Sequence, residues 1–151
     1  DHAFRLTEIL ENLVEGHSNF ELMNRPELFI LNYRFVPQRI RMKLDPLVKE
    51  IDLESDPHRL VKHLTRLKGI NALLNELNIE LHRAIRQEDN SFVSRTMIES
   101  TRYAPQRVVV LRAVTVNPLT TPEILHEIIE EHDRLGSKIY RAEFAGRLDK
   151  M

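Results

Sequence analysis

The sequence contains no cysteine among its 151 residues. A disulfide framework, a zinc site built on thiolates and a cysteine nucleophile are therefore excluded. Long hydrophobic runs are also missing, because the longest apolar stretches, such as Val108–Leu111, fall far short of the roughly 18 residues that a membrane helix needs. Neither charge is in excess, with 22 basic against 23 acidic residues. This balance gives no electrostatic reason to expect a nucleic acid or a membrane surface as a partner.

Glycine is scarce, with only Gly16, Gly69, Gly136 and Gly146 in the chain. These dispersed residues cannot form a Walker A loop, a G-x-G-x-x-G turn or a G-x-S-x-G nucleophile turn. The sequence therefore predicts no phosphate-binding loop of its own. The same scarcity favours long helices.

Apolar residues make up 42% of the chain and charged residues 30%, which is ordinary for a globular protein of about one domain. The chain begins at Asp1 inside an amphipathic pattern, with no basic and apolar leader before it. We therefore expect a piece of a longer protein without a signal peptide. The absence of cysteine is compatible with a cytoplasmic location.

Hydrophobic periodicity predicts three helices and four strands. The helices are expected at 2–15, from Asp56-Pro57 to about Asp89-Asn90, and from the Thr120-Thr121-Pro122-Glu123 segment to about 147, where Thr120 and Glu123 have capping-box spacing. The strands are expected at 20–23, 28–36, 91–99 and 107–116. Residues 38–56 are charged and irregular, and we interpret them as a surface connection with at most one helical turn.

This order of elements predicts an α+β domain. Hairpin-like neighbours make the strands antiparallel, so we expect an antiparallel sheet of about four strands with helices packed on one face.

The seven histidines do not form a metal-binding pattern. His126 and His132 are six residues apart, which places them about 120° apart around a helix, where they cannot share an ion. His58 and His63 lack a third ligand. We therefore expect no metal site, and we interpret these histidines, like the charged stretch 127–134, as solvent-exposed helix surface.

Arg112 carries the one chemical signal in the predicted strands. With a period of two, it shares a strand face with four valines: Val108, Val110, Val114 and Val116. A guanidinium on an apolar face needs an anion, because an unpaired buried charge costs several kcal/mol. The anion is either an internal helix glutamate or the carboxylate of a ligand, which arginine binds at two points; a face open to water would also satisfy the charge.

Several short segments occur together in a characteristic order. They are Asn19-Phe20-Glu21-Leu22, Pro26-Glu27-Leu28, Asn32-Tyr33-Arg34-Phe35-Val36-Pro37, Ser94-Arg95-Thr96, Val110-Leu111-Arg112 and Asn117-Pro118-Leu119-Thr120-Thr121. Their order and spacing resemble the C-terminal end of the pyridoxal-phosphate-dependent group II decarboxylases, which act on glutamate, aspartate, diaminobutyrate and aromatic amino acids. The stretch 87–96 is most similar to aspartate 1-decarboxylase-like members.

The resemblance implies the small C-terminal domain of a fold type I enzyme, with residues 1–19 as a lead-in helix from the large domain and 20–151 as the small domain. It implies pyridoxal 5'-phosphate bound by the missing large domain of the same chain, because this sequence has no His-Lys pair for the Schiff base. It implies a cytoplasmic homodimer as the full-length enzyme and a small acidic amino acid, aspartate or glutamate, as substrate. Arg112 corresponds to the family residue that binds the substrate α-carboxylate. The fragment alone is expected to be inactive.

Two alternatives remain open from the sequence. The parent enzyme could act on diaminobutyrate or another amino acid, because the residues that select the side chain belong mostly to the missing domain. The chain could instead be a free-standing α+β module that binds other proteins.

Overall fold

The computed structural model describes residues 1–88 and 92–151 of the chain. In these ranges the elements follow in the order α1 (His2–Glu15), β1 (Phe20–Leu22), β2 (Ile30–Phe35), α2 (Gln38–Leu53), α3 (Pro57–Gln87), β3 (Val93–Glu99), β4 (Arg107–Val114), α4 (Pro122–Ile139), a π-helical turn η1 (Tyr140–Phe144) and α5 (Ala145–Leu148). The predicted helix end near Asp89-Asn90 and the predicted strand start at Ser91 lie outside the described residues.

The four strands form one sheet in the order β1-β2-β4-β3, and each neighbouring pair is antiparallel. The central strand β4 pairs with β2 and β3, so that Arg112 lies opposite Asn32 on one side and Ser94 on the other. The predicted α+β class and the four-stranded antiparallel sheet are confirmed.

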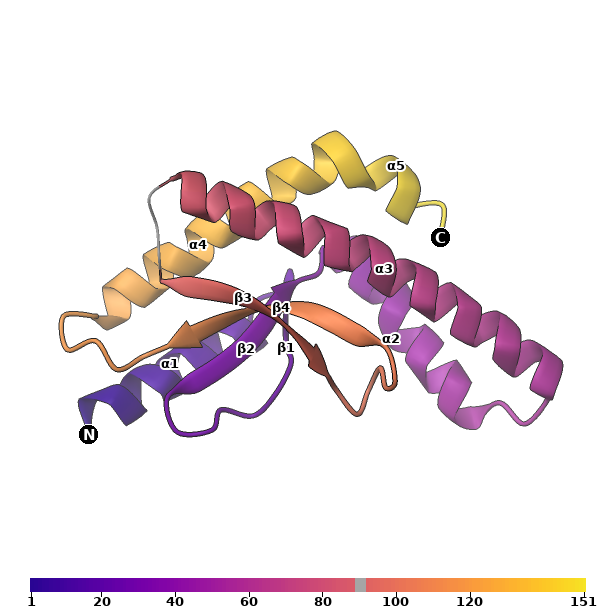
Figure 1. Ribbon diagram of the computed structural model, residues 1–151, viewed down its shortest axis with the longest axis horizontal. Coiled ribbons are helices and arrows are strands. Elements are labelled where there is room, and N and C mark those ends of the chain that lie inside the picture. The colour runs from indigo at the N-terminus through magenta and orange to yellow at the C-terminus, as the bar shows by residue number, and fades with distance from the viewer. Residues whose placement is uncertain (89–91) are drawn as a thin grey trace.

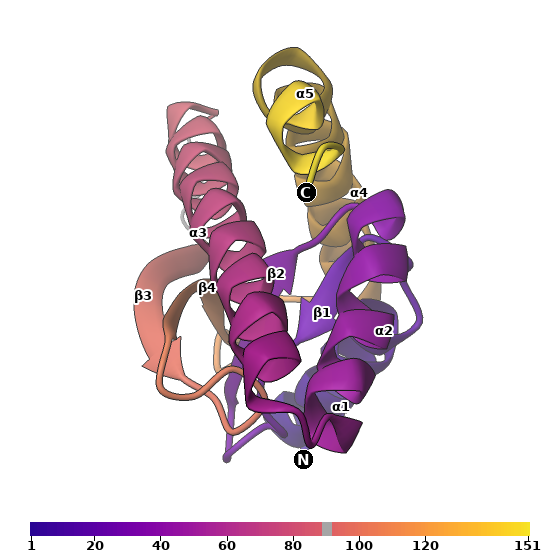
Figure 2. The same ribbon diagram turned by 90° about the vertical axis from the view of Figure 1, so that its right-hand side faces the viewer.

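The helices are arranged around this sheet in an elongated molecule. Figure 1 shows α3 and α4 on one side of the sheet, with α2 lying beside the first half of α3. The view in Figure 2 places α1 next to the edge strand β1. The long α3 therefore links the sheet layer to a helical hairpin that it forms with α2.

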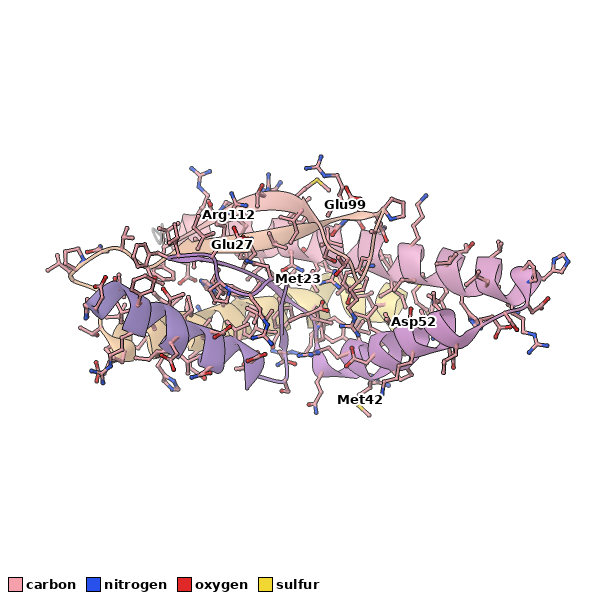
Figure 3. All side chains as sticks on the ribbon, turned by 90° about the horizontal axis from the view of Figure 1, so that it is seen from below. Met23, Glu27, Met42, Asp52, Glu99 and Arg112 are labelled. Atoms are coloured by element: carbon pink, nitrogen blue, oxygen red, sulfur yellow. The ribbon has the colours of Figure 1, made fainter. Side chains whose placement is uncertain are left out.

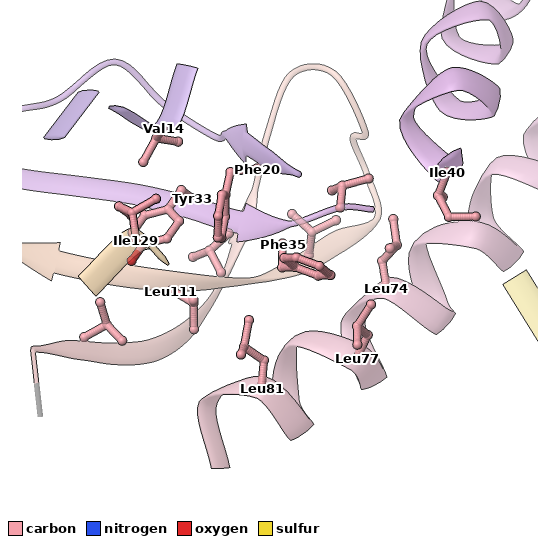
Figure 4. Packing of buried hydrophobic residues seen from close by; sticks show 14 of the residues in the cluster. Val14, Phe20, Tyr33, Phe35, Ile40, Leu74, Leu77, Leu81, Leu111 and Ile129 are labelled. Atoms are coloured by element: carbon pink, nitrogen blue, oxygen red, sulfur yellow. The ribbon is translucent and has the colours of Figure 1, made fainter. Parts of the chain in front are cut away.

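The core lies between the sheet and the helices. Figure 4 shows Phe20, Tyr33 and Phe35 of the sheet close to Val14 of α1 and Ile129 of α4, with leucines of α3 on the other side. All of these aromatic side chains are fully buried. Their alternation along β2 directs Leu31, Tyr33 and Phe35 toward the helices, as the sequence pattern predicts.

The interpretation of residues 38–56 as a surface connection is wrong. Residues 38–53 of this segment form the 16-residue helix α2, which contains Pro46 and buries Ile40, Leu44 and Leu47 on one face. Their spacing of four and three residues is helical, although the charged residues between them mask it. Proline inside a helix costs about 3 kcal/mol, but burial of several leucine-sized side chains offsets this cost.

Two details at the helix ends also differ from expectation. The N-cap of α4 is Thr121, whose hydroxyl accepts a hydrogen bond from the backbone N–H of Ile124 at 3.2 Å, whereas Thr120 is buried. In α3 the predicted apolar stripe is buried only from Leu67 onward, and Val61 and Leu64 are exposed. The first turns of α3 extend past the sheet, where only α2 can cover them (Figure 1).

Candidate functional site

Arg112 lies at the boundary between the covered and the open half of one sheet face. This face, opposite Tyr33 and Phe35, carries the even-numbered residues of β4. Toward the start of the strand Val108 and Val110 are fully buried, whereas Val114 is 44% exposed and Val116, just beyond the strand, is 54% exposed. Figure 3 shows Arg112 on the side of the sheet away from α3. Arg112 thus shares a face with the four valines as predicted, but only the part of that face with Val108 and Val110 is covered.

The side chain of Arg112 has one hydrogen-bond partner in the described chain, and that partner is neutral. Its Nε–H donates to Oδ1 of Asn32 on β2 at 3.1 Å. Within residues 1–88 and 92–151, no aspartate or glutamate oxygen lies within ion-pairing distance of it. An internal ion pair with a helix glutamate, one of the interpretations given for this residue, is therefore not observed among the described residues. Asn32 therefore orients the guanidinium of Arg112 without neutralising its positive charge.

A buried charged cluster lies farther along the same face, and the sequence interpretation did not identify it. Glu21 of β1 accepts three hydrogen bonds: from Arg34 Nε at 2.8 Å, from the Tyr103 hydroxyl at 2.6 Å and from Arg102 Nη1 at 2.7 Å. Burial raises the pKa of Glu21, but Arg34, Tyr103 and Arg102 together bring that pKa below its ordinary value. Glu21 is thus an ionised carboxylate fully used by internal donors.

Arg34 is the most buried member of this cluster. Its side chain is 0% exposed, and its Nη1 and Nη2 have no hydrogen-bond partner among the described residues, although the guanidinium lies over the ring of Tyr103 at 4.8 Å from the centroid. Cation–π attraction and the pair with Glu21 offset part of its desolvation. The signal for it was present in the sequence, since Arg34 stands between the core residues Tyr33 and Phe35.

The histidines are placed differently from the prediction. His126 is exposed as expected, but His132 is fully buried, with Nδ1 at 2.9 Å from the Tyr33 hydroxyl. The reason is its position on the same α4 stripe as Leu125, Ile128 and Ile129, so that charge in the neighbouring sequence is a poor guide to its exposure. His58 is exposed, and the nearest acidic contact of His63 is Glu50 at 3.8 Å. No three acidic or histidine side chains gather as metal ligands in the part of the chain that the structure describes.

The described residues do not fit a pyridoxal-phosphate site. All six lysines lie in the described ranges, and none is buried. Lys43 donates a hydrogen bond to the backbone carbonyl of Asp149. None of the six lysines is therefore placed as a buried anchor for the cofactor. Along the described ranges, moreover, no helix combines the length and the apolar character needed to cross a membrane.

Among the remaining predicted motif residues, Ser94, Arg95 and Thr96 lie on the edge strand β3, and the backbone of Ser94 is paired with that of Arg112. The stretch 87–96, whose sequence is similar to that of aspartate 1-decarboxylase-like proteins, contains residues 89–91, which are outside the described residues.

Comparison with known proteins gives a consistent set of relatives. The chain is 32% identical over 126 residues to aspartate 1-decarboxylase of Aliivibrio fischeri, covering 83% of this chain and 20% of that protein. Among solved structures, it resembles mouse CSAD with a TM-score of 0.53 and 22% identity, covering 89% of this chain and 22% of the other. It also resembles Oryza sativa TDC with PLP and tryptamine, with a TM-score of 0.60 and 13% identity over 91% of this chain and 22% of the other. No family model matches the chain.

The matches cover nearly all of this chain but only a small part of each relative. The chain spans about a fifth of the length of its relatives, while nearly all of its own length is matched. The structural likeness therefore concerns one domain, and it shows a shared fold.

Proposed function

We propose that this decarboxylase-like domain is the small C-terminal domain of a pyridoxal-phosphate-dependent amino-acid decarboxylase whose large domain holds the cofactor. The substrate we propose is a small acidic amino acid, aspartate or glutamate, and the 32% identity to an aspartate 1-decarboxylase favours aspartate. The parent enzyme is proposed to be a cytoplasmic homodimer. In this proposal the domain contributes substrate binding and closure of the active site, and it does not catalyse the reaction alone.

The observation that carries this proposal is the half-open Arg112. Its guanidinium is partly exposed, is held by Asn32 and has no carboxylate partner among the described residues, so an incoming anion can reach it. Its planar guanidinium matches a carboxylate at two points. We propose that Arg112 binds the substrate α-carboxylate and holds it in the orientation needed for loss of CO₂. Pyridoxal phosphate supplies the electron-withdrawing chemistry for that step when bound. Because the carboxylate loses its charge during the reaction, Arg112 acts through positioning more than through transition-state charge.

Substitution of Arg112 in the full-length enzyme tests this role. We expect Arg112→Ala to cost about 2–5 kcal/mol in kcat/KM, the range for losing one partner of a buried charge pair. Arg112→Lys should recover only part of the loss, because an ammonium lacks the planar fork. The melting temperature should change little, since no internal carboxylate loses its partner. Arg107→Ala, at an exposed arginine on the same strand, is the matched control. A large stability loss with unchanged KM would reject the assignment.

The substrate class and the division of labour need separate tests. The full-length enzyme, incubated with a panel of amino acids, should release CO₂ fastest from aspartate or glutamate. If CO₂ is released faster from diaminobutyrate, the proposal of an acidic amino acid as substrate is wrong. The 151-residue chain by itself should retain no pyridoxal-phosphate absorbance after gel filtration. Stoichiometric retention with turnover would show that this chain holds the cofactor after all.

A further inference from the structure

We infer that Asn32 is the residue that positions Arg112 for the substrate carboxylate, an inference that rests on the role proposed above for Arg112. Asn32 and Arg112 are directly opposite each other in the β2–β4 pair, and Asn32 Oδ1 accepts the Nε–H of Arg112 at 3.1 Å. Asn32 is only 7% exposed, whereas Arg112 is partly exposed. One partner is thus fixed in the sheet and the other reaches toward solvent.

The position of this hydrogen bond on the guanidinium determines which donors remain free. An arginine has five N–H donors, one on Nε and four on the two Nη atoms. Asn32 takes the Nε donor, so the outer edge formed by Nη1 and Nη2 remains for a carboxylate. A bond at Nε also restricts rotation about the end of the side chain. A two-point contact at the Nη edge therefore becomes available in one orientation.

The chemical type of the partner matters as much as its place. An amide oxygen accepts a hydrogen bond from Arg112 without neutralising its charge, whereas a carboxylate at the same position would form an internal ion pair. The residue opposite Arg112 on the other neighbouring strand, Ser94, is also neutral. The carboxylate of Glu21, on the same sheet face, is already bound by Arg34, Arg102 and Tyr103. The surroundings orient the cation and keep it available for an external anion.

Asn32 is itself held by its backbone. Its N–H donates to Asn24 Oδ1 at 3.0 Å, and its carbonyl accepts from the N–H of Met23 at 2.9 Å. These bonds fix β2 against the segment that follows β1. Since arginine can only donate, the amide of Asn32 must present its oxygen to Arg112. The side chain therefore has one defined orientation for its positioning role.

Two substitutions in the full-length enzyme separate charge from orientation. Asn32→Asp keeps the shape but adds a carboxylate that competes with the substrate, so we expect KM to rise at least about tenfold with the melting temperature unchanged or higher. Asn32→Leu removes the acceptor, so we expect kcat to fall and KM to rise more modestly, because Arg112 binds in several orientations. Calorimetry with succinate, a dicarboxylate without an amino group, should show weaker binding in both variants. Ser94→Ala, at the β3 position paired with Arg112 through the backbone, removes no side-chain hydrogen bond of Arg112 in the described ranges and should match the wild type.

Arg112→Ala, measured beside these variants, separates the proposed role of Arg112 from the positioning role of Asn32. If Arg112→Ala leaves KM and succinate binding unchanged, the proposed role of Arg112 fails, and the positioning role fails with it. If Arg112→Ala weakens both but Asn32→Asp and Asn32→Leu bind like the wild type, only the role of Asn32 is overturned. Should Asn32→Asp not fold, Asn32→Leu alone decides between these outcomes.

Discussion

The hydroxyl of Tyr33 on β2 and Nδ1 of His132 on α4 lie 2.9 Å apart inside the core and join the sheet to its covering helix. Both side chains are fully buried, and burial lowers the pKa of His132 to about 4. Within residues 1–88 and 92–151, His132 Nε2 has no hydrogen-bond partner. The imidazole is therefore neutral at pH 7, and its protonation would place a charge in an apolar environment.

Folded-state stability should consequently fall as the pH decreases from about 6.5 to about 4. In this window the unfolded chain protonates His132 near the ordinary pKa of 6.5, while the folded chain resists protonation down to about 4. The unfolded state then binds more protons, so stability decreases with decreasing pH, by about 3 kcal/mol for this residue. Urea unfolding of the chain at several pH values measures the change.

Substitution of His132 shows whether this residue is responsible. His132→Gln keeps a polar partner for Tyr33 but cannot titrate, so the pH dependence should become much shallower. A residual slope of the same sign is expected from His82, whose pKa is also lowered, by burial and by nearby Arg95 and Arg86. His126→Gln, at an exposed position of the same helix, should keep the full wild-type slope. An equally steep slope in His132→Gln would exclude His132 as the source.

The pair of Glu21 and Arg34 predicts a large stability loss when one partner is removed. Glu21→Gln leaves the fully buried Arg34 guanidinium without a carboxylate, and we expect the free energy of unfolding to drop by about 3–5 kcal/mol. The exposed pair of Arg83 and Glu80 is the control, since Glu80→Gln should cost less than about 1 kcal/mol. Similar losses in both variants would mean that water reaches Arg34 in solution.

Strands and most helices could be predicted from the sequence because their patterns are local. Alternation in 30–35 and the apolar run in 107–114 are visible without tertiary information. Helix α2 was missed because its buried residues are few and lie between charged ones. Its stability depends on packing against α3, a contact between segments that the sequence pattern alone does not pair.

The site was predictable only in part for a related reason. Arg112 could be singled out because a single cation interrupts an apolar strand. Its partner Asn32 could not, since the pairing depends on the register between β2 and β4, strands that are not consecutive in the chain. His132 was misassigned because its buried position depends on which face of α4 meets Tyr33. In each case a long-range pairing decided the environment of the residue.

The domain boundary predicted between residues 19 and 20 can be tested by hydrogen exchange. Helix α1 buries Leu6, Leu10 and Val14, and the Thr7 and Thr115 hydroxyls are 2.5 Å apart, but Phe4 near its start is 52% exposed. Because α1 packs at an edge of the fold, we expect its amides to exchange faster than those of Val108–Val114. Equally slow exchange in both segments would place α1 within the cooperative core of 20–151.

Gly136 of α4 provides a test of how closely α4 packs on the sheet. A Cβ added at this position would lie 2.7 Å from a ring carbon of Phe35, which is fully buried on β2. The ring is enclosed by other core side chains and cannot move without disturbing them, so Gly136→Ala should destabilise the fold by about 1–3 kcal/mol. A Cβ at Gly146, in α5, would meet no atom within 4 Å, so Gly146→Ala should be neutral or stabilising by up to about 1 kcal/mol through helix propensity. Chemical denaturation of both variants measures the difference, and equal stability would show that Phe35 has room to move away from α4.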